Sequence, residues 1–181
     1  AKSYGFDGMI ILCNGDASDN YANMGINGVF AYNWGTAGSS LQVNKDRILR
    51  SAKNARIPTV PTISVGFDSV PWHQKRYNLM TVEDYAAAME WVKNDYVPKY
   101  SPKYDWADNF MWLSTWNEYG EGTYVMPCAG LHGFGYLENV AEVISGVTDH
   151  SNNIYPTEQQ KARLGHLYPD SKTSLERLDI E

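Results

Sequence analysis

Glu118 and Glu121 are the residues whose type and spacing point most directly to chemistry. They lie in the segment 116–123, Trp-Asn-Glu-Tyr-Gly-Glu-Gly-Thr, which follows an apolar, aromatic run. Hydrolysis of a glycosidic bond needs one carboxyl group to protonate the leaving oxygen and a second to act as nucleophile or base. Two carboxylates held close together resist joint ionisation, so one can stay protonated near neutral pH. The pair therefore predicts a catalytic site; the alternative is that Glu118 caps a turn and Glu121 faces solvent.

The run before the glutamates, residues 109–116, predicts the strand that positions them. It is short, continuously apolar and bounded by turn residues, which is typical of a parallel strand covered on both faces. In α/β barrels, catalytic groups collect at the carboxyl ends of such strands. Gly120 and Gly122 allow the following segment to turn sharply. We therefore expect both carboxylates at the catalytic rim of a parallel sheet.

The rest of the chain alternates between strand and helix patterns. We expect strands at 8–14, 28–34, 59–65 and 109–116, and helices at 41–56, 81–96, 137–144 and 157–169. This alternation predicts an α/β fold with a parallel sheet. A closed (β/α)8 TIM barrel needs about 250 residues. We therefore interpret residues 1–169 as the C-terminal half of such a barrel, strands five to eight, and residues 170–181 as a polar tail.

Polar and aromatic side chains follow the predicted strands and could bind a sugar. Aromatic rings pack against the C–H faces of sugars, and amides, carboxylates and guanidinium groups hydrogen-bond to hydroxyls. The alternative for each is ordinary loop packing. The candidate substrate-binding residues are Tyr32, Asn33, Trp34, Asp68, Trp72, Arg76, Trp116, Asn117, Tyr119, Tyr124 and His132.

Composition narrows the class of partner. A formal charge of −6 and a pI near 5.2 argue against broad nucleic-acid binding, which needs concentrated Lys and Arg. No apolar stretch reaches the roughly 18 residues of a membrane span. Six Trp and 13 Tyr in a chain that is 43% hydrophobic fit a globular protein with an aromatic-rich site. An oligo- or polysaccharide is the expected substrate.

No cofactor or metal is predicted. Two cysteines cannot form a four-thiolate zinc site, and neither a Walker loop nor a nucleophile elbow occurs. Segment 130–135 follows no clean strand, so it fails the dinucleotide fingerprint and is interpreted as a loop over the site. Asn14, Asp16, Ser18 and Asn20 alternate like calcium ligands, but positions six and twelve of that loop are Asp19 and Gly25.

Three segments together resemble one family. Segments 116–124, 133–137 and 167–169 resemble bacterial proteins of the WbsX-like group, related to glycoside hydrolase family 99. The resemblance extends over nearly the whole chain and is most specific at Asn117-Glu118 and Glu121-Gly122. It implies a (β/α)8 barrel, of which this chain is the C-terminal half, and action on α-mannosides or related α-linked glycans in polysaccharides. It also suggests a secreted or periplasmic enzyme, whereas the residues themselves give no cellular address.

The resemblance further implies residue roles. Glu118 would take a proton from the sugar's 2-hydroxyl and Glu121 would protonate the leaving oxygen, so the configuration is retained through a transient epoxide. Family 99 has His where this chain has Gly120, which leaves the substrate less defined than the reaction. Members of the WbsX-like group are also described as glycosyltransferases. A transferase and a non-catalytic glycan-binding fragment are therefore the alternatives, and the missing N-terminal half of the barrel or a second copy is an expected partner.

Overall fold

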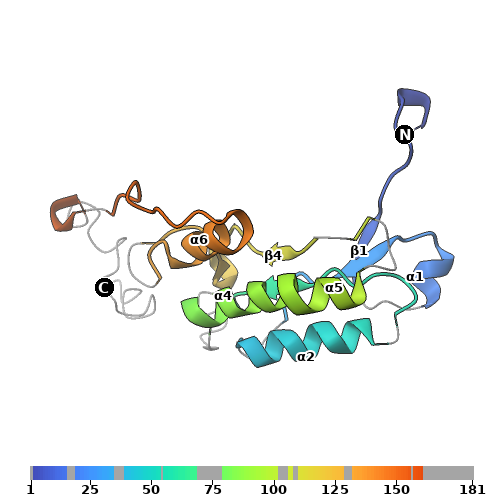
Figure 1. Cartoon of the computed structure of the whole chain (residues 1–181), viewed down its shortest axis with the longest axis horizontal. Helices are drawn as coiled ribbons and strands as arrows, with labels where there is room; N and C mark the ends of the chain where they lie inside the picture. The colour runs from blue at the N-terminus through green and yellow to red at the C-terminus, as the bar shows by residue number, and fades with distance from the viewer. Residues whose placement is uncertain are drawn as a thin grey trace, which may run out of the picture.

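Figure 1 shows the computed structural model of the chain. It describes residues 2–15, 19–34, 39–53, 55–68, 79–101, 106–107, 110–128, 132–155 and 157–160. In chain order the elements are η1 (Lys2–Tyr4), β1 (Leu12–Asn14), α1 (Asp19–Asn23), β2 (Gly28–Phe30), α2 (Leu41–Ala52), β3 (Thr62–Ser64), α4 (Val82–Trp91), η2 (Val92–Tyr96), α5 (Val97–Tyr100), β4 (Trp112–Ser114), β5 (Asn117–Glu118), η3 (Tyr119–Glu121), β6 (Thr123–Tyr124), α6 (Gly135–Val140) and η4 (Ala141–Ser145).

Four parallel strands follow one another in chain order. β1 pairs with β2 and β3 pairs with β4, both in parallel. A parallel bridge between Val29 and Thr59 joins the two pairs, with the Val60 amide donating to the Val29 carbonyl at 2.7 Å. The order β1-β2-β3-β4 with helices between the strands confirms a mixed helix and strand fold. The described strands do not close into a barrel.

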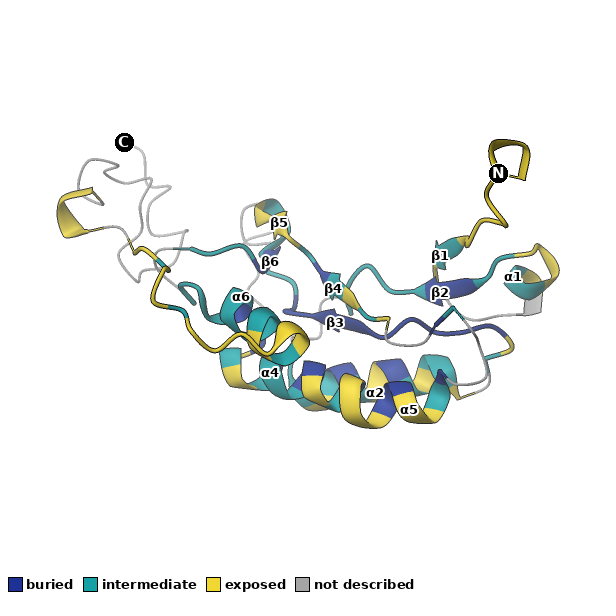
Figure 2. Ribbon diagram, turned by 45° about the horizontal axis from the view of Figure 1, so that its top comes forward, coloured by how far each residue is buried: buried dark blue, intermediate teal, exposed yellow. Residues whose placement is uncertain are grey.

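The long helices cover one side of these strands (Figure 2). α2 begins after Ser40, whose hydroxyl accepts a hydrogen bond from the Val43 amide, and α4 begins after Thr81, whose hydroxyl accepts one from the Asp84 amide at 3.1 Å. The predicted N-cap at Thr81 is therefore confirmed. α4 continues through the π-helical η2 into α5, so one long rod spans the sheet.

The core lies between the sheet and these helices. Several of its polar groups are hydrogen-bonded: Asn44 on α2 donates to Ser39 Oγ at 2.9 Å and accepts from the Ser64 amide at 3.0 Å, which ties the helix to β3. The hydroxyl of Tyr96 donates to the Thr59 carbonyl at 2.9 Å. The fully buried apolar residues of the core are Ile48, Ile63, Val65, Met80, Tyr85, Ala88, Met89, Val92 and Tyr96.

The opposite side of the sheet is open within the described chain. Leu113 packs toward the core, whereas its neighbour Trp112 points the other way and is 36% exposed. The Trp112 ring packs against Phe30, with centroids 4.6 Å apart. Our prediction that strand 109–116 is covered on both faces is therefore wrong for the described chain. The alternation of side chains along a strand buries one face here and leaves the other to solvent.

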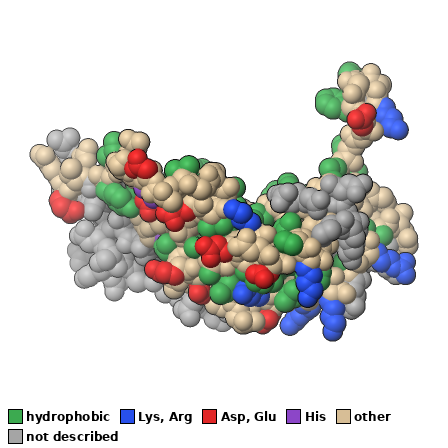
Figure 3. Space-filling view, in the orientation of Figure 1, with side chains coloured by type: hydrophobic (Ala, Val, Ile, Leu, Met, Phe, Trp, Pro, Cys, Tyr) green, Lys and Arg blue, Asp and Glu red, His purple; other side chains and the backbone are tan. Residues whose placement is uncertain are grey.

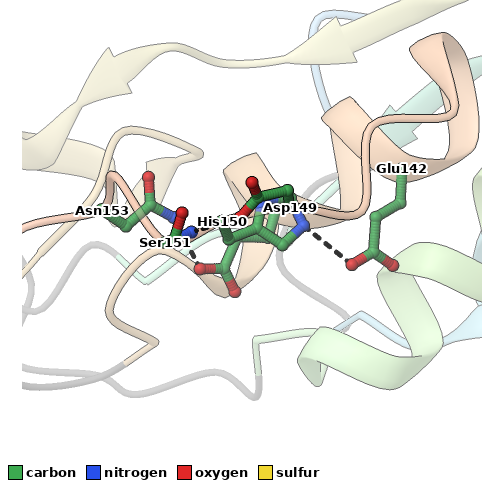
Figure 4. Close-up of polar contacts among 6 residues, drawn as sticks. Glu142, Asp149, His150, Ser151 and Asn153 are labelled. Carbon is green, nitrogen blue, oxygen red and sulfur yellow. Dashed lines mark hydrogen bonds and ion pairs between the residues drawn. The ribbon is translucent and has the colours of Figure 1, made fainter.

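The segment after η4 folds back over α6. His150 Nε2 lies 2.8 Å from Glu142 Oε1 on η4, and the Asn153 side chain donates to Glu138 Oε1 at 2.7 Å. Figure 4 shows Glu142, His150 and the turn at Asp149, whose Oδ1 accepts from the Ser151 amide at 3.0 Å. These polar contacts and the packing of the Tyr155 ring against Phe134, with centroids 4.9 Å apart, hold the segment, whereas its aliphatic residues Val147 and Ile154 are exposed.

The ends of several predicted elements shift. The first strand is shorter than predicted because residues 8–11 are exposed and outside the ladder, and α2 ends at Ala52 rather than at 56. The predicted capping box at Thr157 is confirmed: its amide donates to Gln160 Oε1 at 2.8 Å and its hydroxyl accepts from the Gln160 amide at 3.2 Å. The remainder of that predicted helix and the predicted tail 170–181 lie outside the described residues. No helix in the described part of the chain is long and apolar enough to cross a membrane.

Candidate functional site

The two glutamates lie on a small hairpin directly after β4. Strand β5 carries Glu118 and pairs in antiparallel fashion with β6, and the 3-10 turn η3 between them carries Glu121. Gly122 closes the turn with a φ of +61°, a conformation that favours glycine. Glu118 is the residue that precedes the 3-10 turn, and Glu121 is its last residue. The local fold therefore places the two glutamates at the two ends of one tight turn.

Backbone contacts anchor this hairpin to the end of β4. The Val125 amide donates to the Thr115 carbonyl at 2.8 Å, and the Met126 amide donates to the Trp116 carbonyl at 2.9 Å. Thr123, which is fully buried, donates its hydroxyl to the Ser114 carbonyl at 3.3 Å. The position of the glutamates is thus set by the strand, as the sequence predicts.

The segment after β3 packs against the same hairpin. The Asp68 amide donates to the Glu121 carbonyl at 2.8 Å. A methyl group placed on Gly122 would lie 2.7 Å from both the Cβ and the carbonyl oxygen of Asp68, so the two backbones touch without a side chain between them. The ends of β3 and β4 therefore converge, and they bring Asp68 next to Glu121.

Tyr32 reaches this cluster from the end of β2. Burial raises the pKa of its phenol, and a side-chain hydrogen bond to Glu121 and the negative charges of Glu121 and Glu118 raise it further. A phenol that both carboxylates influence lies within electrostatic reach of both. Tyr32 therefore remains protonated at neutral pH and can donate to a carboxylate or a substrate oxygen.

Two carboxylate oxygens of the cluster are buried without a hydrogen-bond partner. They are Glu121 Oε2 and Asp68 Oδ1, and no donor among the described residues reaches either one. Buried polar atoms are nearly always hydrogen-bonded, and exceptions gather where a water, an ion or a ligand binds. These oxygens mark the point at which a polar ligand would complete the site.

The aromatic candidates divide into exposed and packed groups. Trp116 is 53% exposed and Tyr119 is 47% exposed, so each offers a ring face beside the glutamates. Trp34, in contrast, packs against the core and donates its indole N–H to the Thr62 carbonyl at 2.9 Å. Asn33, next to it, is half-buried. Trp116 and Tyr119 are therefore the better placed of these residues to stack on a sugar.

On the β6 side of the hairpin lies a polar and aromatic group that includes one residue our sequence analysis missed. Tyr124, opposite Asn117 in the hairpin, has its ring centroid 5.2 Å from that of His132, which also contacts Tyr136. Cys128, absent from our candidates, has its Sγ 3.6 Å from His132 Nδ1. Burial raises the pKa of the Tyr124 phenol, and Cys128 contributes to that shift. The four-residue spacing of Cys128 and His132 was the available signal.

Several other candidates cannot be placed. Trp72 and Arg76 lie outside the described residues, as do Asp16 and Ser18 of the calcium-like pattern. Within the described ranges, no three His, Cys, Asp or Glu side chains come together as metal ligands would.

Comparison with known proteins gives one match. The family model described as "Glycosyltransferase WbsX" matches residues 22–140, well over half of the chain, including β2 to α6 and the hairpin. Neither a curated protein nor a solved structure matches. The family description indicates a carbohydrate-active enzyme related to polysaccharides.

Proposed function

Because the chain belongs to the WbsX family, we propose that it is part of a retaining glycoside hydrolase that cleaves α-linked, mannoside-like glycans in polysaccharides. Glu118 and Glu121 are the catalytic pair in this proposal. Asp68, Tyr32, Trp116, Asn117 and Tyr119 surround the substrate. The observation that carries it is the meeting of the segment after β3 with the hairpin: the Asp68 amide donates to the Glu121 carbonyl at 2.8 Å, and one carboxylate oxygen of each residue is buried without a hydrogen-bond partner among the described residues.

The proposed reaction uses the two acids in different roles. Glu118 accepts the proton of the sugar's 2-hydroxyl, whose oxygen bonds to the anomeric carbon as the bond to the leaving oxygen breaks. Glu121 gives its proton to that leaving oxygen. Water then opens the epoxide: Glu121 takes a proton from the water, and Glu118 returns its proton to the 2-oxygen. Two inversions at the anomeric carbon retain its configuration, and the 2-hydroxyl must lie trans to the leaving group, as in α-mannosides.

The surroundings of Glu121 suit the acid role. One of its oxygens is buried, and Tyr32 interacts with the carboxyl group. Glu118 is exposed on β5 and accessible to a sugar hydroxyl. Of the two carboxyl groups, Glu121 is thus the more enclosed and Glu118 the more accessible.

The bare side of the sheet supports the barrel part of the proposal. Four parallel strands in chain order, with helices on one side, are the arrangement expected of one wall of a (β/α)8 barrel. In that architecture the remaining strands would cover Trp112 and Phe30, and the hairpin would stand at the carboxyl rim. The rest of a barrel, or a second copy, supplies that cover in our proposal.

A glycosyltransferase is the second candidate. It is favoured by the printed description of the family. The same two acids could serve it, with an acceptor hydroxyl in place of water, so the two reactions differ in donor and acceptor rather than in the residues described.

The test compares the full-length protein with Glu118→Gln and Glu121→Gln on α-mannans and other α-linked polysaccharides. Each substitution is expected to lower the rate roughly 10²–10⁴-fold, the range for loss of an acid or base. Glu90→Gln, at an exposed position on α4, is the matched control and should keep full activity. Incubation with nucleotide sugars and an oligosaccharide acceptor tests transfer in parallel.

An activated substrate separates the two roles. An aryl α-mannoside with an acidic phenol needs no protonation of its leaving oxygen, so Glu121→Gln should regain the first step, seen as a burst of released phenol, whereas Glu118→Gln should not. Activity that survives in both variants with the natural glycan would exclude this mechanism and leave glycan binding as the function. Transfer without hydrolysis would assign the transferase.

A further inference from the structure

A cavity of about 400 Å³ lies beside the glutamate cluster and does not include it. The strand side contributes Asn14 at the end of β1, Gly15 after it, and Phe30, Ala31, Asn33 and Trp34 at and after the end of β2; the helix side contributes Arg47, Arg50 and Ser51 of α2. Its volume lies within the range of roughly 300–1,000 Å³ typical of small-molecule sites. Tyr32, whose pKa Glu121 helps to raise, does not line the cavity but lies between the lining residues Ala31 and Asn33, so one strand end connects the cavity to the glutamate cluster.

Two arginines dominate the charge of this cavity. Arg47 and Arg50 are three residues apart on α2, so they lie on one face of the helix, where like charges repel. Within the described ranges neither guanidinium forms an ion pair with a carboxylate. Asp46, the nearest acid in sequence, accepts instead from the Gln42 side chain at 2.7 Å. Among the described residues, the cavity therefore concentrates two positive charges that no carboxylate pairs with.

The surrounding chain makes this concentration of charge unusual. The protein carries a net charge of −6. Figure 3 shows basic side chains gathered over the end of the molecule that carries α1 and α2, and acidic side chains mostly toward the α4 and α6 end. An anion is repelled by most of this protein and attracted at the arginine cavity.

The strand side of the cavity adds a fixed donor and apolar surface. Asn14 Oδ1 accepts from the Tyr32 amide at 3.1 Å, so the Asn14 side-chain oxygen is engaged and its N–H₂ group is left to donate. Phe30 and Trp34 contribute aromatic surface. Guanidinium groups bind carboxylates, sulfates and phosphates through paired, charge-assisted hydrogen bonds. Two guanidinium groups, an amide donor and aromatic surface together suit a sugar that carries a negative charge.

We propose that this cavity, lined by Arg47, Arg50 and Asn14, binds the anionic group of a sugar ligand next to the active site. Two sources share this chemistry: an acidic sugar residue of a polysaccharide, and the diphosphate of a nucleotide sugar. The inference extends the proposed function by naming an anionic substrate class. It does not require the reaction at Glu118 and Glu121, because binding is measured without turnover.

The experiment is a calorimetric titration of the full chain with three probes: sodium D-glucuronate, D-glucose and inorganic pyrophosphate. Glucuronate or pyrophosphate is expected to bind, glucose to bind at least tenfold more weakly, and added salt to weaken anion binding. Arg47→Gln and Arg50→Gln should each lower the affinity about tenfold, the effect of one charge-assisted hydrogen bond. Lys53→Gln, which removes a positive charge from the exposed C-cap of the same helix, should leave it unchanged.

The probes also separate the two sources. Preference for glucuronate assigns an acidic polysaccharide, and preference for pyrophosphate assigns a nucleotide-sugar donor. Equal binding of glucose and glucuronate, binding unchanged in the Arg47→Gln/Arg50→Gln double variant, or no binding of either anion at millimolar concentration would overturn the proposal. Glu121→Gln should bind the anion normally, so failure of the catalytic proposal and failure of the anion site give different results. Circular dichroism checks that each variant is folded.

Discussion

The core under the sheet and the hairpin beyond β4 distribute polar and apolar groups in opposite ways. In the core, Asn44 is buried and satisfied on both sides of its amide. At the hairpin, aromatic rings are exposed while carboxylate oxygens of Glu121 and Asp68 are buried without a partner among the described residues. Two further buried hydroxyls, those of Tyr85 in the core and Ser114 on β4, share that condition. The hairpin differs from the core in that its unpartnered atoms are carboxylate oxygens beside exposed aromatic rings, where a ligand could complete the site.

The largest expected effect is the loss of stability when a core side chain is shortened. Ile63→Ala removes a fully buried side chain from the centre of β3 and is expected to lower the free energy of unfolding by about 2–5 kcal/mol. Ile144→Ala, at a position that is 46% exposed, is the matched control and should change it by less than about 0.5 kcal/mol. Urea denaturation measures both. Equal losses would mean that the helix-covered face is not the stabilising core.

Gly122→Ala should affect the site more than the scaffold. The new methyl group would meet Asp68 at 2.7 Å, and Ala at a φ of +61° costs about 1–2 kcal/mol. We expect lower stability and a marked fall in enzymatic rate, because Asp68 must move away from Glu121.

Gly146→Ala is the control for that substitution. Its φ is +69°, but nothing lies within 4 Å of the added methyl group. It should therefore lose stability only through the unfavourable positive φ of alanine, and it should keep full enzymatic activity. If both variants kept full activity, the contact between Asp68 and the hairpin would have no role in the reaction.

Alkaline pH should weaken the packed region through its tyrosines. Burial raises the pKa of Tyr85, and it raises the pKa of Tyr136 to about 12. Because these pKa values are raised in the folded state, their contribution is fully present below the unfolded pKa of about 10 and is lost as pH rises toward the folded value. The free energy of unfolding should fall by about 1 kcal/mol per pH unit for each such phenol between roughly pH 10 and 12.

Tyr136→Phe isolates one of these groups. The variant loses the hydrogen bond to the Met80 carbonyl and should be less stable at neutral pH. Its stability should nevertheless fall less steeply with pH, since one phenol fewer must ionise. A slope identical to that of the parent protein would show that Tyr136 does not contribute.

The smallest effect belongs to the folded-back segment. Glu142→Gln removes the carboxylate 2.8 Å from His150, a partly exposed pair, and at pH 5, where imidazoles are ordinarily protonated, it should lower the free energy of unfolding by about 0.2–1 kcal/mol in low salt. The difference should shrink at high salt, because exposed charges are screened. Glu90→Gln serves as the unpaired reference. A loss that does not respond to salt would assign the effect to packing.

Local signals in the sequence predicted the helix caps better than the strand ends. The cap at Thr81 depends on neighbours within one turn, so the residues specify it. The end of a strand depends on a distant partner: residues 8–11 are apolar enough for a strand, but the described chain gives them no neighbour that extends the ladder. The antiparallel pairing of β5 with β6 likewise depends on Gly122 taking a positive φ, which the two glycines of the motif permit without requiring.

The position of the candidate site was predictable in part, because it depends on the order of strands and helices. Parallel strands bring their carboxyl ends to one edge, so the meeting of Tyr32, Asp68 and Glu121 follows from the alternation of strands and helices. The alternation does not predict which aromatic residues are exposed. Trp34 packs against the core and Trp116 is exposed because of the directions of their side chains in loops. The contact between Cys128 and His132 depends in the same way on the path of the chain after β6.

The bond between the Asp68 amide and the Glu121 carbonyl also limits how the site can move. Together with the bare backbone of Gly122 against Asp68, it makes the segment after β3 and the hairpin one mechanical unit. Neither can swing as a hinge without displacing the other and the acid between them. A ligand that reaches Glu121 would therefore meet two segments whose spacing is already fixed, so its binding would not need these segments to close on each other.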